Sequence, residues 1–275
     1  WLAGLLHDCG KITTPVHVVD KATKLETIFD RIALIDTRYE VLLRDAEIAA
    51  LRQQAAQPQQ KDAIARALEL EQAALREERD FIRRVNIGGE SMAPADQERV
   101  RQIARRRWRA ADGELSDFLD ADEMENLTIR AGTLTAAERA IVNNHISVSI
   151  RMLEALPWPK HLSKVPEYAG GHHERMDGKG YPRGLTKEQM SVPARLMAIA
   201  DIFEALTARD RPYKKGKSLS ESLRILGNFS LNGHIDPELF DVFIRSKVYL
   251  TFAEKHLHPS QIDAVDEAAI PGYTP

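Results

Sequence analysis

Histidine and aspartate residues recur in this sequence at positions where they could bind metal ions. Two adjacent histidines, His172 and His173, precede a glycine-rich turn, and His7 and Asp8 follow an apolar helical stretch. Neutral imidazole is the most common metal ligand in proteins. Each pair also has an ordinary explanation, as surface histidines beside a β-turn or as a capped helix end. The full candidate set contains four histidines and two aspartates: His7, Asp8, His145, His172, His173 and Asp201.

The other two candidates, His145 and Asp201, lie within predicted helices. His145 lies on an apolar helix face, where a single histidine is often an ordinary core residue. Asp201 lies among apolar residues of a helix predicted over residues 193–210, and burying an ionised carboxylate is costly unless it is paired or metal-bound. Together the six side chains offer nitrogen and oxygen donors without a thiolate. That set suits two mid-series divalent ions such as Fe, Mn or Zn.

Positive charge is available for an anionic substrate. Lys11 follows the first His-Asp pair closely, and Arg211 and Lys214 follow the helix that carries Asp201. Such cations complement the charge of a phosphodiester. We expect Cys9 to be a packed thiol and not a ligand.

A long charged segment separates the first candidate pair from the others. Apolar residues recur at alternating spacings of three and four over residues 25–49, which is typical of a coiled-coil seam. Pro58 marks the tip of a hairpin, and a second helix returns over about residues 62–85. The seam could simply join the two helices. Alternatively, a second exposed stripe could form a homodimer or bind a signalling protein.

Capping residues and breakers predict further helices. Thr135 and Glu138 form a capping box that starts the helix of His145. A basic helix is expected over about residues 97–110, and a last helix, capped at Asp236, over residues 233–246.

The composition restricts the class of protein. With 275 residues, 43% hydrophobic content and a net charge of -3, the chain can bury a substantial core and has no excess of basic residues for a nucleic acid polymer. No apolar run is long enough to span a membrane, and no export signal is recognisable. The single Cys9 fits a reducing compartment, so we expect a cytoplasmic protein. Because the sequence begins at Trp1 without a methionine, we expect it to be part of a longer, sensor-linked protein.

Several motifs resemble the HD-GYP branch of the HD superfamily of metal-dependent phosphohydrolases. They are HDCGK from His7, the lone His145, HHERMDGKGYP from His172 and ADIFEALTARDRPYKK from Ala200. The resemblance implies an all-α fold, a helical bundle of the HD superfamily interrupted by a long antiparallel helical hairpin. The expected boundaries are residues 1–20 and 131–258 for the HD-GYP domain, 21–130 for the inserted hairpin and 259–275 for a C-terminal tail.

The resemblance also implies roles for individual residues. His7, Asp8, His145, His172, His173 and Asp201 match the metal ligands, with Asp8 bridging two ions. Lys11, Arg211 and Lys214 match the residues that hold the substrate phosphate. The signature loop beside the site, which would contact the substrate, is matched by Asp177, Gly178, Gly180, Tyr181 and Pro182.

The activity implied is hydrolysis of cyclic di-GMP to linear pGpG, and further to GMP. A hydroxide bridging two ions would attack phosphorus, with Asp8 and Lys11 as the catalytic residues. The family places a further Glu and His upstream, which this sequence does not include, so the presence of a third ion is left open. Two alternatives are a phosphohydrolase of another cyclic dinucleotide or nucleotide, and a non-catalytic sensor or interaction module for cyclic dinucleotides.

Overall fold

The structure, a computed structural model, describes residues 1–110, 112–209 and 216–275. These residues form two compact units. The main unit contains Trp1–Pro15 and Ala140–Pro275, and the inserted unit contains Val16–Arg139. Each has hydrophobic core clusters of its own.

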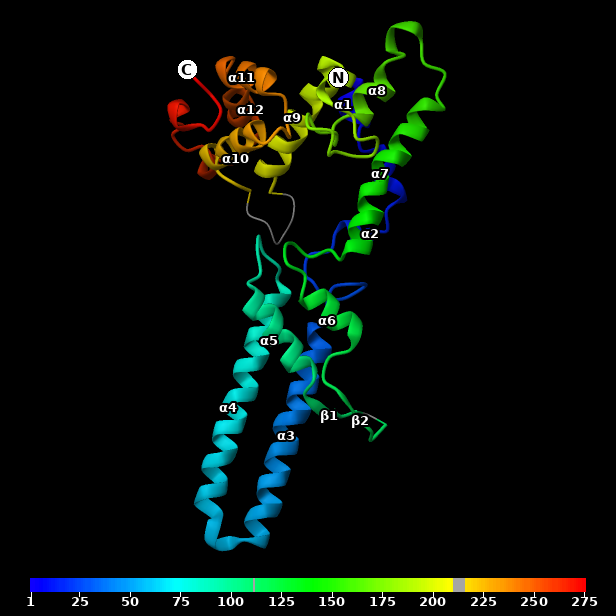
Figure 1. Cartoon of the computed structure of the whole chain (residues 1–275). Helices are drawn as coiled ribbons and strands as arrows, with labels where there is room; N and C mark the ends of the chain where they lie inside the picture. The colour runs from blue at the N-terminus through cyan, green and yellow to red at the C-terminus, as the bar shows by residue number, and fades with distance from the viewer. Residues whose placement is uncertain (111, 210–215) are drawn as a thin grey trace. The chain divides into compact units, whose positions relative to one another are not determined.

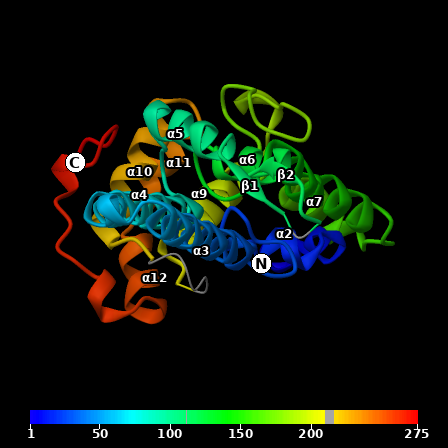
Figure 2. The same ribbon diagram turned by 90° about the horizontal axis from the view of Figure 1, so that it is seen from below.

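The inserted unit is built around a helical hairpin. Its helices are α2 (Val16–Val19), α3 (Ile32–Ala56), α4 (Lys61–Asn86), α5 (Pro94–Ala104) and α6 (Ala121–Leu127). Figure 1 and Figure 2 both show α3 and α4 side by side, and a short 3-10 turn at Pro58–Gln60 joins them. With 25 and 26 residues, each helix is about 38 Å long at 1.5 Å per residue.

The buried side of the hairpin begins later than the apolar spacing predicts. Helix α3 starts at Ile32, where the carboxylate of Asp30 accepts the backbone N–H of Ile32 at 3.0 Å. Ile28, which the seam pattern included, is 93% exposed, whereas Ile35 and Tyr39 are fully buried. The residues before Asp30 thus lie outside the helix, although Leu25 is fully buried in the same core cluster as Ile35 and Tyr39.

The predicted basic helix over residues 97–110 is wrong in its second half. Helix α5 ends at Ala104, because the backbone N–H of Phe118 donates to the carbonyls of Ala104 and Arg106. The chain then forms strand β1 (Arg107–Arg109), which pairs antiparallel with β2 (Leu115–Asp117). The reversal between the strands includes Gly113 at φ +86°.

Three charged side chains are buried inside the inserted unit: Lys21, whose ammonium group pairs with Glu138 at 2.8 Å, and Glu123 and Lys24. Glu123 is 1% exposed and accepts two bonds from the Arg38 guanidinium, at 2.6 and 2.9 Å. Lys24 is 2% exposed, and its ammonium group donates to the carbonyls of Leu127 and Ile129 at the end of α6. These contacts satisfy all three charges by hydrogen bonding, and burial lowers the pKa of Lys24 to about 8.

Where the structure describes the main unit, its regular elements are helices, apart from an isolated β-bridge between Asp177 and Thr186. Its helices are α1 (Leu2–Leu6), most of α7 (Ala136–Glu154), α8 (Val165–Gly170), α9 (Val192–Thr207), α10 (Leu219–Leu231), α11 (Pro237–Arg245) and α12 (Val248–His256). One core cluster joins α9 to α12, and a smaller one contains Ala3, Leu153, Val165 and Ala169. The predicted last helix corresponds to α11, but α12 follows it after a left-handed residue, Lys247 at φ 54°.

The expected all-α fold with an inserted antiparallel helical hairpin is confirmed, with β1 and β2 as a small exception. Within the described residues, no helix combines the length and the apolar character needed to cross a membrane.

Candidate metal centre

Four segments of the main unit supply the six predicted ligands. The first pair lies at the end of α1, where the following short 3-10 helix (Cys9–Thr13) begins. One histidine projects from α7, two follow α8, and one aspartate lies on α9. The residues are, in that order, His7, Asp8, His145, His172, His173 and Asp201.

Asp8 lies at the centre of this cluster. Its Oδ1 is 3.0 Å from His145 Nε2 and 3.8 Å from His172 Nε2. Its Oδ2 is 3.3 Å from His7 Nε2, which in turn is 3.4 Å from Asp201 Oδ1. Separations near 3 Å are those of neighbouring ligands that each lie about 2.1 Å from one ion. The two oxygens of Asp8 therefore face different sets of ligands.

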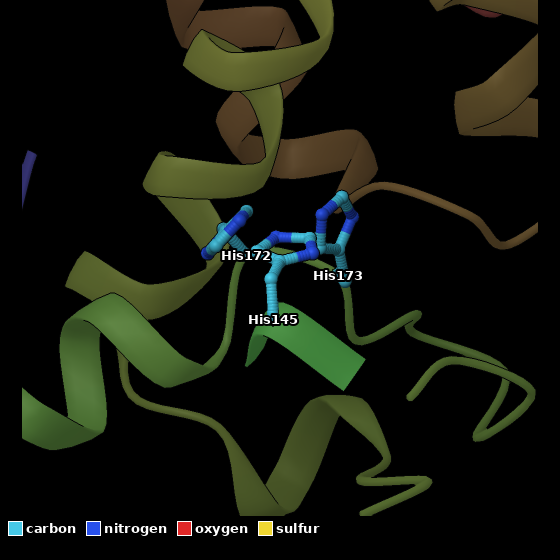
Figure 3. Close-up of side chains that lie close together, drawn as sticks. All are labelled: His145, His172 and His173. Atoms are coloured by element: carbon cyan, nitrogen blue, oxygen red, sulfur yellow. The ribbon is translucent and has the colours of Figure 1, made fainter. Parts of the chain in front are cut away.

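Two overlapping groups could each hold an ion. One contains His145, His172 and His173, and the other contains His7, Asp8 and His172. Within each group the ligand atoms lie within 4.8 Å of one another. Figure 3 shows the three histidine rings of the first group gathered at one place. His172 belongs to both groups, so the two candidate ion positions are adjacent.

Backbone carbonyls orient three of the histidines in the same way. The Nδ1 atom of His7 lies 2.8 Å from the carbonyl oxygen of Gly4, three residues earlier. His145 and His172 have the same contact with the carbonyls three residues before them, at 2.5 and 2.6 Å. A carbonyl can only accept, so Nδ1 carries the proton and Nε2 keeps its lone pair. Each ring thus presents Nε2 as a donor to a metal.

The donor atoms are left without hydrogen-bond partners. Asp8 Oδ1, His145 Nε2 and His172 Nε2 are buried and accept no hydrogen bond from any described residue. An unsatisfied buried polar atom costs about 1–3 kcal/mol. Lone pairs of His145 and Asp8 would also face each other at 3.0 Å, an arrangement that a cation relieves. The residues therefore fit divalent metal ions.

The pKa values in the cluster follow from its two carboxylates and its burial. Burial raises the pKa of Asp8, but contacts with His145 and Lys11 outweigh it and hold the pKa well below the ordinary range. The contact with Asp201 raises the pKa of His7 in spite of burial. Burial lowers the pKa of His173 to about 3, so its ring is neutral. Burial raises the pKa of Asp201, but its contacts, first of all that with His7, outweigh burial and lower the pKa. Both carboxylates are thus ionised and attract positive charge, which a divalent ion would supply.

Gly10 brings Asp8 against α7. A Cβ at this position would lie 2.1 Å from the carbonyl oxygen of His145 and 2.6 Å from the backbone nitrogen of Ser149. The N–H of Gly10 also donates to Ser149 Oγ at 2.8 Å. From the sequence, Gly10 is expected only to end the first helix, and its contact with α7 is seen only in the fold.

The signature loop (residues 177–182) lies beside the cluster. The ring of Tyr181 stacks on the ring of His173, with centroids 4.8 Å apart and planes 15° apart. Gly178 has φ +73°, and Tyr181 is joined to Pro182 by a cis peptide bond. The carboxylate of Asp177 accepts the N–H of Lys179 at 3.1 Å and pairs with Arg175, which directly precedes Met176.

A buried acid that the sequence analysis missed holds this loop. Glu174 is 1% exposed, and its carboxylate accepts the N–H groups of Arg183 at 2.7 Å and Leu185 at 2.8 Å. An acidic residue directly after the His pair and before a glycine-rich turn was the available signal.

Of the three predicted cations, the structure describes one. The ammonium group of Lys11 pairs with Asp8 Oδ2, and its side chain is 42% exposed. Arg211 and Lys214 lie outside the described residues.

Comparison with known proteins identifies an HD domain. Residues 121–239 match the family model of the HD domain. Over 117 residues the chain is 40% identical to a cyclic di-GMP phosphodiesterase of Pseudomonas aeruginosa, covering 42% of this chain and 27% of that protein. It is 38% identical over 122 residues to the 3'3'-cGAMP-specific phosphodiesterase 1 of Vibrio cholerae, covering 44% and 27%. A cyclic di-GMP phosphodiesterase of Thermotoga maritima is 35% identical over 128 residues, covering 46% and 34%.

The chain spans about a quarter to a third of the length of these relatives. The family match includes His145, the His pair, Asp201 and the signature loop. The match begins after the helical hairpin, so His7 and Asp8 lie outside it. An HD domain binds divalent metal, and the His/Asp cluster agrees with that property. This match and these relatives show that the chain contains an HD domain similar to those of cyclic dinucleotide phosphodiesterases.

Proposed function

We propose that this chain is a metal-dependent phosphodiesterase that hydrolyses a cyclic dinucleotide, with cyclic di-GMP as the first substrate to test. The observation that carries the proposal is the cluster of buried, unpartnered donor atoms around Asp8. The activities for which the three relatives above are named supply the substrate class. The products would be linear pGpG and, after a second cleavage, GMP. A cytoplasmic location is part of this proposal.

Two divalent ions would occupy the centre, with Fe or Mn favoured and Zn as an alternative. The candidate ligand groups are His145, His172 and His173 on one side and His7, Asp8 and His172 on the other. His172 would serve one of the two ions, because its only free lone pair is on Nε2. Asp201 would complete the second site, since its carboxylate lies 3.4 Å from His7. Such donors of nitrogen and oxygen suit these metals. A third ion would require ligands from outside this sequence.

When bound, such ions supply positive charge to a phosphate oxygen and make water more acidic. The chain itself contributes orientation and further charge. Asp8 would hold both sites together, because its two oxygens face different histidines. Lys11 would move from Asp8 to a phosphate oxygen, which its exposed side chain permits. Arg211, Lys214 and the signature loop residues Asp177, Gly178, Gly180, Tyr181 and Pro182 would complete the substrate site.

The direct experiment is hydrolysis by protein loaded with Fe or Mn under anaerobic conditions. We expect cyclic di-GMP to be converted to pGpG, measured by chromatography. Asp8→Ala should lose turnover and bound metal together. Lys164→Ala is the control, because Lys164 is 70% exposed and pairs only with Glu167 on α8. Full activity after removal of the metal would refute the proposal.

A second candidate substrate is a mixed ring. One relative is named a 3'3'-cGAMP-specific phosphodiesterase, at nearly the same identity as the first relative. Turnover of both rings by the same preparation decides between them. A loaded protein that binds either ring without cleaving it would be a sensor module instead.

The inserted unit gives a basis for partner binding. Leu34, Ile48 and Leu51 of α3 are 45%, 45% and 57% exposed. Pairing of two copies through the hairpin, or binding of a signalling protein, therefore stays a prediction. Sedimentation velocity of the whole chain, and of a variant with these three residues changed to Gln, would test the homodimer.

A further inference from the structure

His173 differs from the other histidines of the cluster in how its ring is held. His7, His145 and His172 each have Nδ1 against a backbone carbonyl. No hydrogen bond from the described part of the chain reaches the ring of His173. Because ligand orientation normally depends on such outer contacts, something else must fix this ring.

The aromatic ring of Tyr181 fixes the His173 ring instead. It lies nearly parallel to the His173 ring, at 4.8 Å and 15°. Its other ring contacts are with His172, at 4.3 Å, and with His145, at 5.4 Å in a T-shaped arrangement. An aromatic pair of this kind contributes about 0.5–1.5 kcal/mol beyond the area it buries. The His173 ring is therefore confined on several sides without a hydrogen bond.

The position of Tyr181 is itself fixed through the backbone. Its N–H donates to the carbonyl oxygen of His173 at 3.1 Å. The residue before it, Gly180, packs so closely that a Cβ would lie 2.5 Å from Glu174 Cα. After Tyr181, the N–H groups of Arg183 and Leu185 donate to the buried carboxylate of Glu174. Glu174, the residue that directly follows His173, thus holds the loop on both sides of Tyr181.

We propose that Tyr181 and Glu174 are positioning residues for His173: Tyr181 holds the imidazole ring by stacking, and Glu174 holds Tyr181 by fixing the loop. This inference rests on the metal centre proposed above. It gives the tyrosine of the signature loop a task in metal binding, besides the substrate contact proposed above. Neither residue touches the ion.

The test is titration of metal-stripped protein with Mn²⁺, with free Mn²⁺ counted by electron paramagnetic resonance. Tyr181→Ala removes the stacking contact. The Mn²⁺ affinity of one of the two binding steps should therefore fall by about 10- to 100-fold. Tyr181→Phe keeps the ring and should bind like the wild type. Glu174→Gln replaces one acceptor oxygen by an NH₂ group that faces a backbone N–H, so Mn²⁺ binding should weaken as well.

Arg183→Ala is the matched control in the same loop. It removes a side chain that pairs with the exposed Glu154 but leaves the backbone N–H that Glu174 accepts. Its Mn²⁺ affinity should equal that of the wild type. Thermal unfolding of every variant, followed by circular dichroism, establishes that the fold is retained. If Glu174→Gln does not fold, the Tyr181 pair of variants decides the question alone.

The outcomes separate this inference from the proposed function. A wild-type protein that binds no Mn²⁺ would refute the metal centre itself. A wild type that binds Mn²⁺ and hydrolyses the substrate, with equal Mn²⁺ affinity in Tyr181→Ala, would overturn only the positioning role. In that case a raised KM at unchanged metal affinity would assign Tyr181 to the substrate. Weak binding by Tyr181→Phe would also overturn the inference, because the hydroxyl and not the stack would then matter.

Discussion

Replacement of Gly10 by alanine tests how closely the first ligand pair must approach α7. The added methyl group would lie 2.1 Å from the carbonyl oxygen of His145, and 2.6 and 2.8 Å from the nitrogen and hydroxyl of Ser149. The nearest atoms are backbone atoms of a long helix, so they cannot rotate away. Relief requires that the short helix that follows Asp8 move by about 1.4 Å, since ordinary carbon contacts begin near 3.5 Å.

The expected cost has two parts. Overpacking of this kind costs about 1–3 kcal/mol. Loss of the hydrogen bond from Gly10 N–H to Ser149 Oγ adds about 0.5–1.5 kcal/mol. Gly10→Ala should therefore lower the free energy of unfolding of the main unit by about 2–4 kcal/mol. Because Asp8 moves with Gly10, Mn²⁺ affinity should also fall, by about 10- to 100-fold.

Gly4→Ala is the matched control. Gly4 lies in α1, and a Cβ there would meet only Met197 Sδ, at 3.9 Å. Alanine in a helix is more stable than glycine by about 0.5–1 kcal/mol, so this variant should be slightly stabilised. Chemical denaturation and Mn²⁺ titration measure both effects. If Gly10→Ala matches the wild type in stability and in Mn²⁺ affinity, the close approach does not position Asp8 and the reasoning is refuted.

Three further predictions concern the inserted unit. Arg38→Ala leaves the buried carboxylate of Glu123 without its ion-pair partner and should lower the free energy of unfolding by about 3–5 kcal/mol. Arg107→Ala, which removes an exposed ion pair, is the control and should change it by less than about 1 kcal/mol. Denaturant unfolding compares the two variants. Burial lowers the pKa of Lys24 from 10.5 to about 8, so the unfolded chain binds more protons between these values. The free energy of unfolding should therefore rise with pH across that window, by at most about 3 kcal/mol, and Lys24→Met should abolish the rise; a slope that persists in the variant would contradict this assignment. Replacing residues 47–68 by a short turn should leave Mn²⁺ affinity unchanged, because all six proposed ligands belong to the main unit; weaker binding in calorimetry would disprove that independence.

Local sequence patterns predicted the helices well and their ends less well. The three-four spacing of apolar residues correctly predicts α3 and α4, because helical burial has that period. It also included Ile28, which the structure leaves exposed in a turn that ends at Asp30. The basic stretch after α5 resembled a helix by composition. Pairing with a later strand, which no local spacing reveals, made it β1 instead.

In the candidate site, too, local sequence identified some features, and others depended on contacts between distant segments. Residue type and motif were enough to select the six side chains that the structure brings together around Asp8. The contacts that hold them were not predictable, because they join distant segments. Gly10 and Ser149 are 139 positions apart, and only the fold shows that a side chain at Gly10 would collide with α7. Glu174 is near the His pair in sequence, but its acceptance of two loop N–H groups depends on how the loop returns.

The insertion between the two parts of the main unit sets an order of events during synthesis. His7 and Asp8 leave the ribosome first, and the hairpin follows, able to fold early through contacts between consecutive helices. At about 5–20 residues per second, about 10–40 s pass before Asp201 has been added. Throughout that interval the nascent chain lacks at least one of the six proposed metal ligands. Metal delivery to this protein is therefore expected to be a late event, after translation of α9.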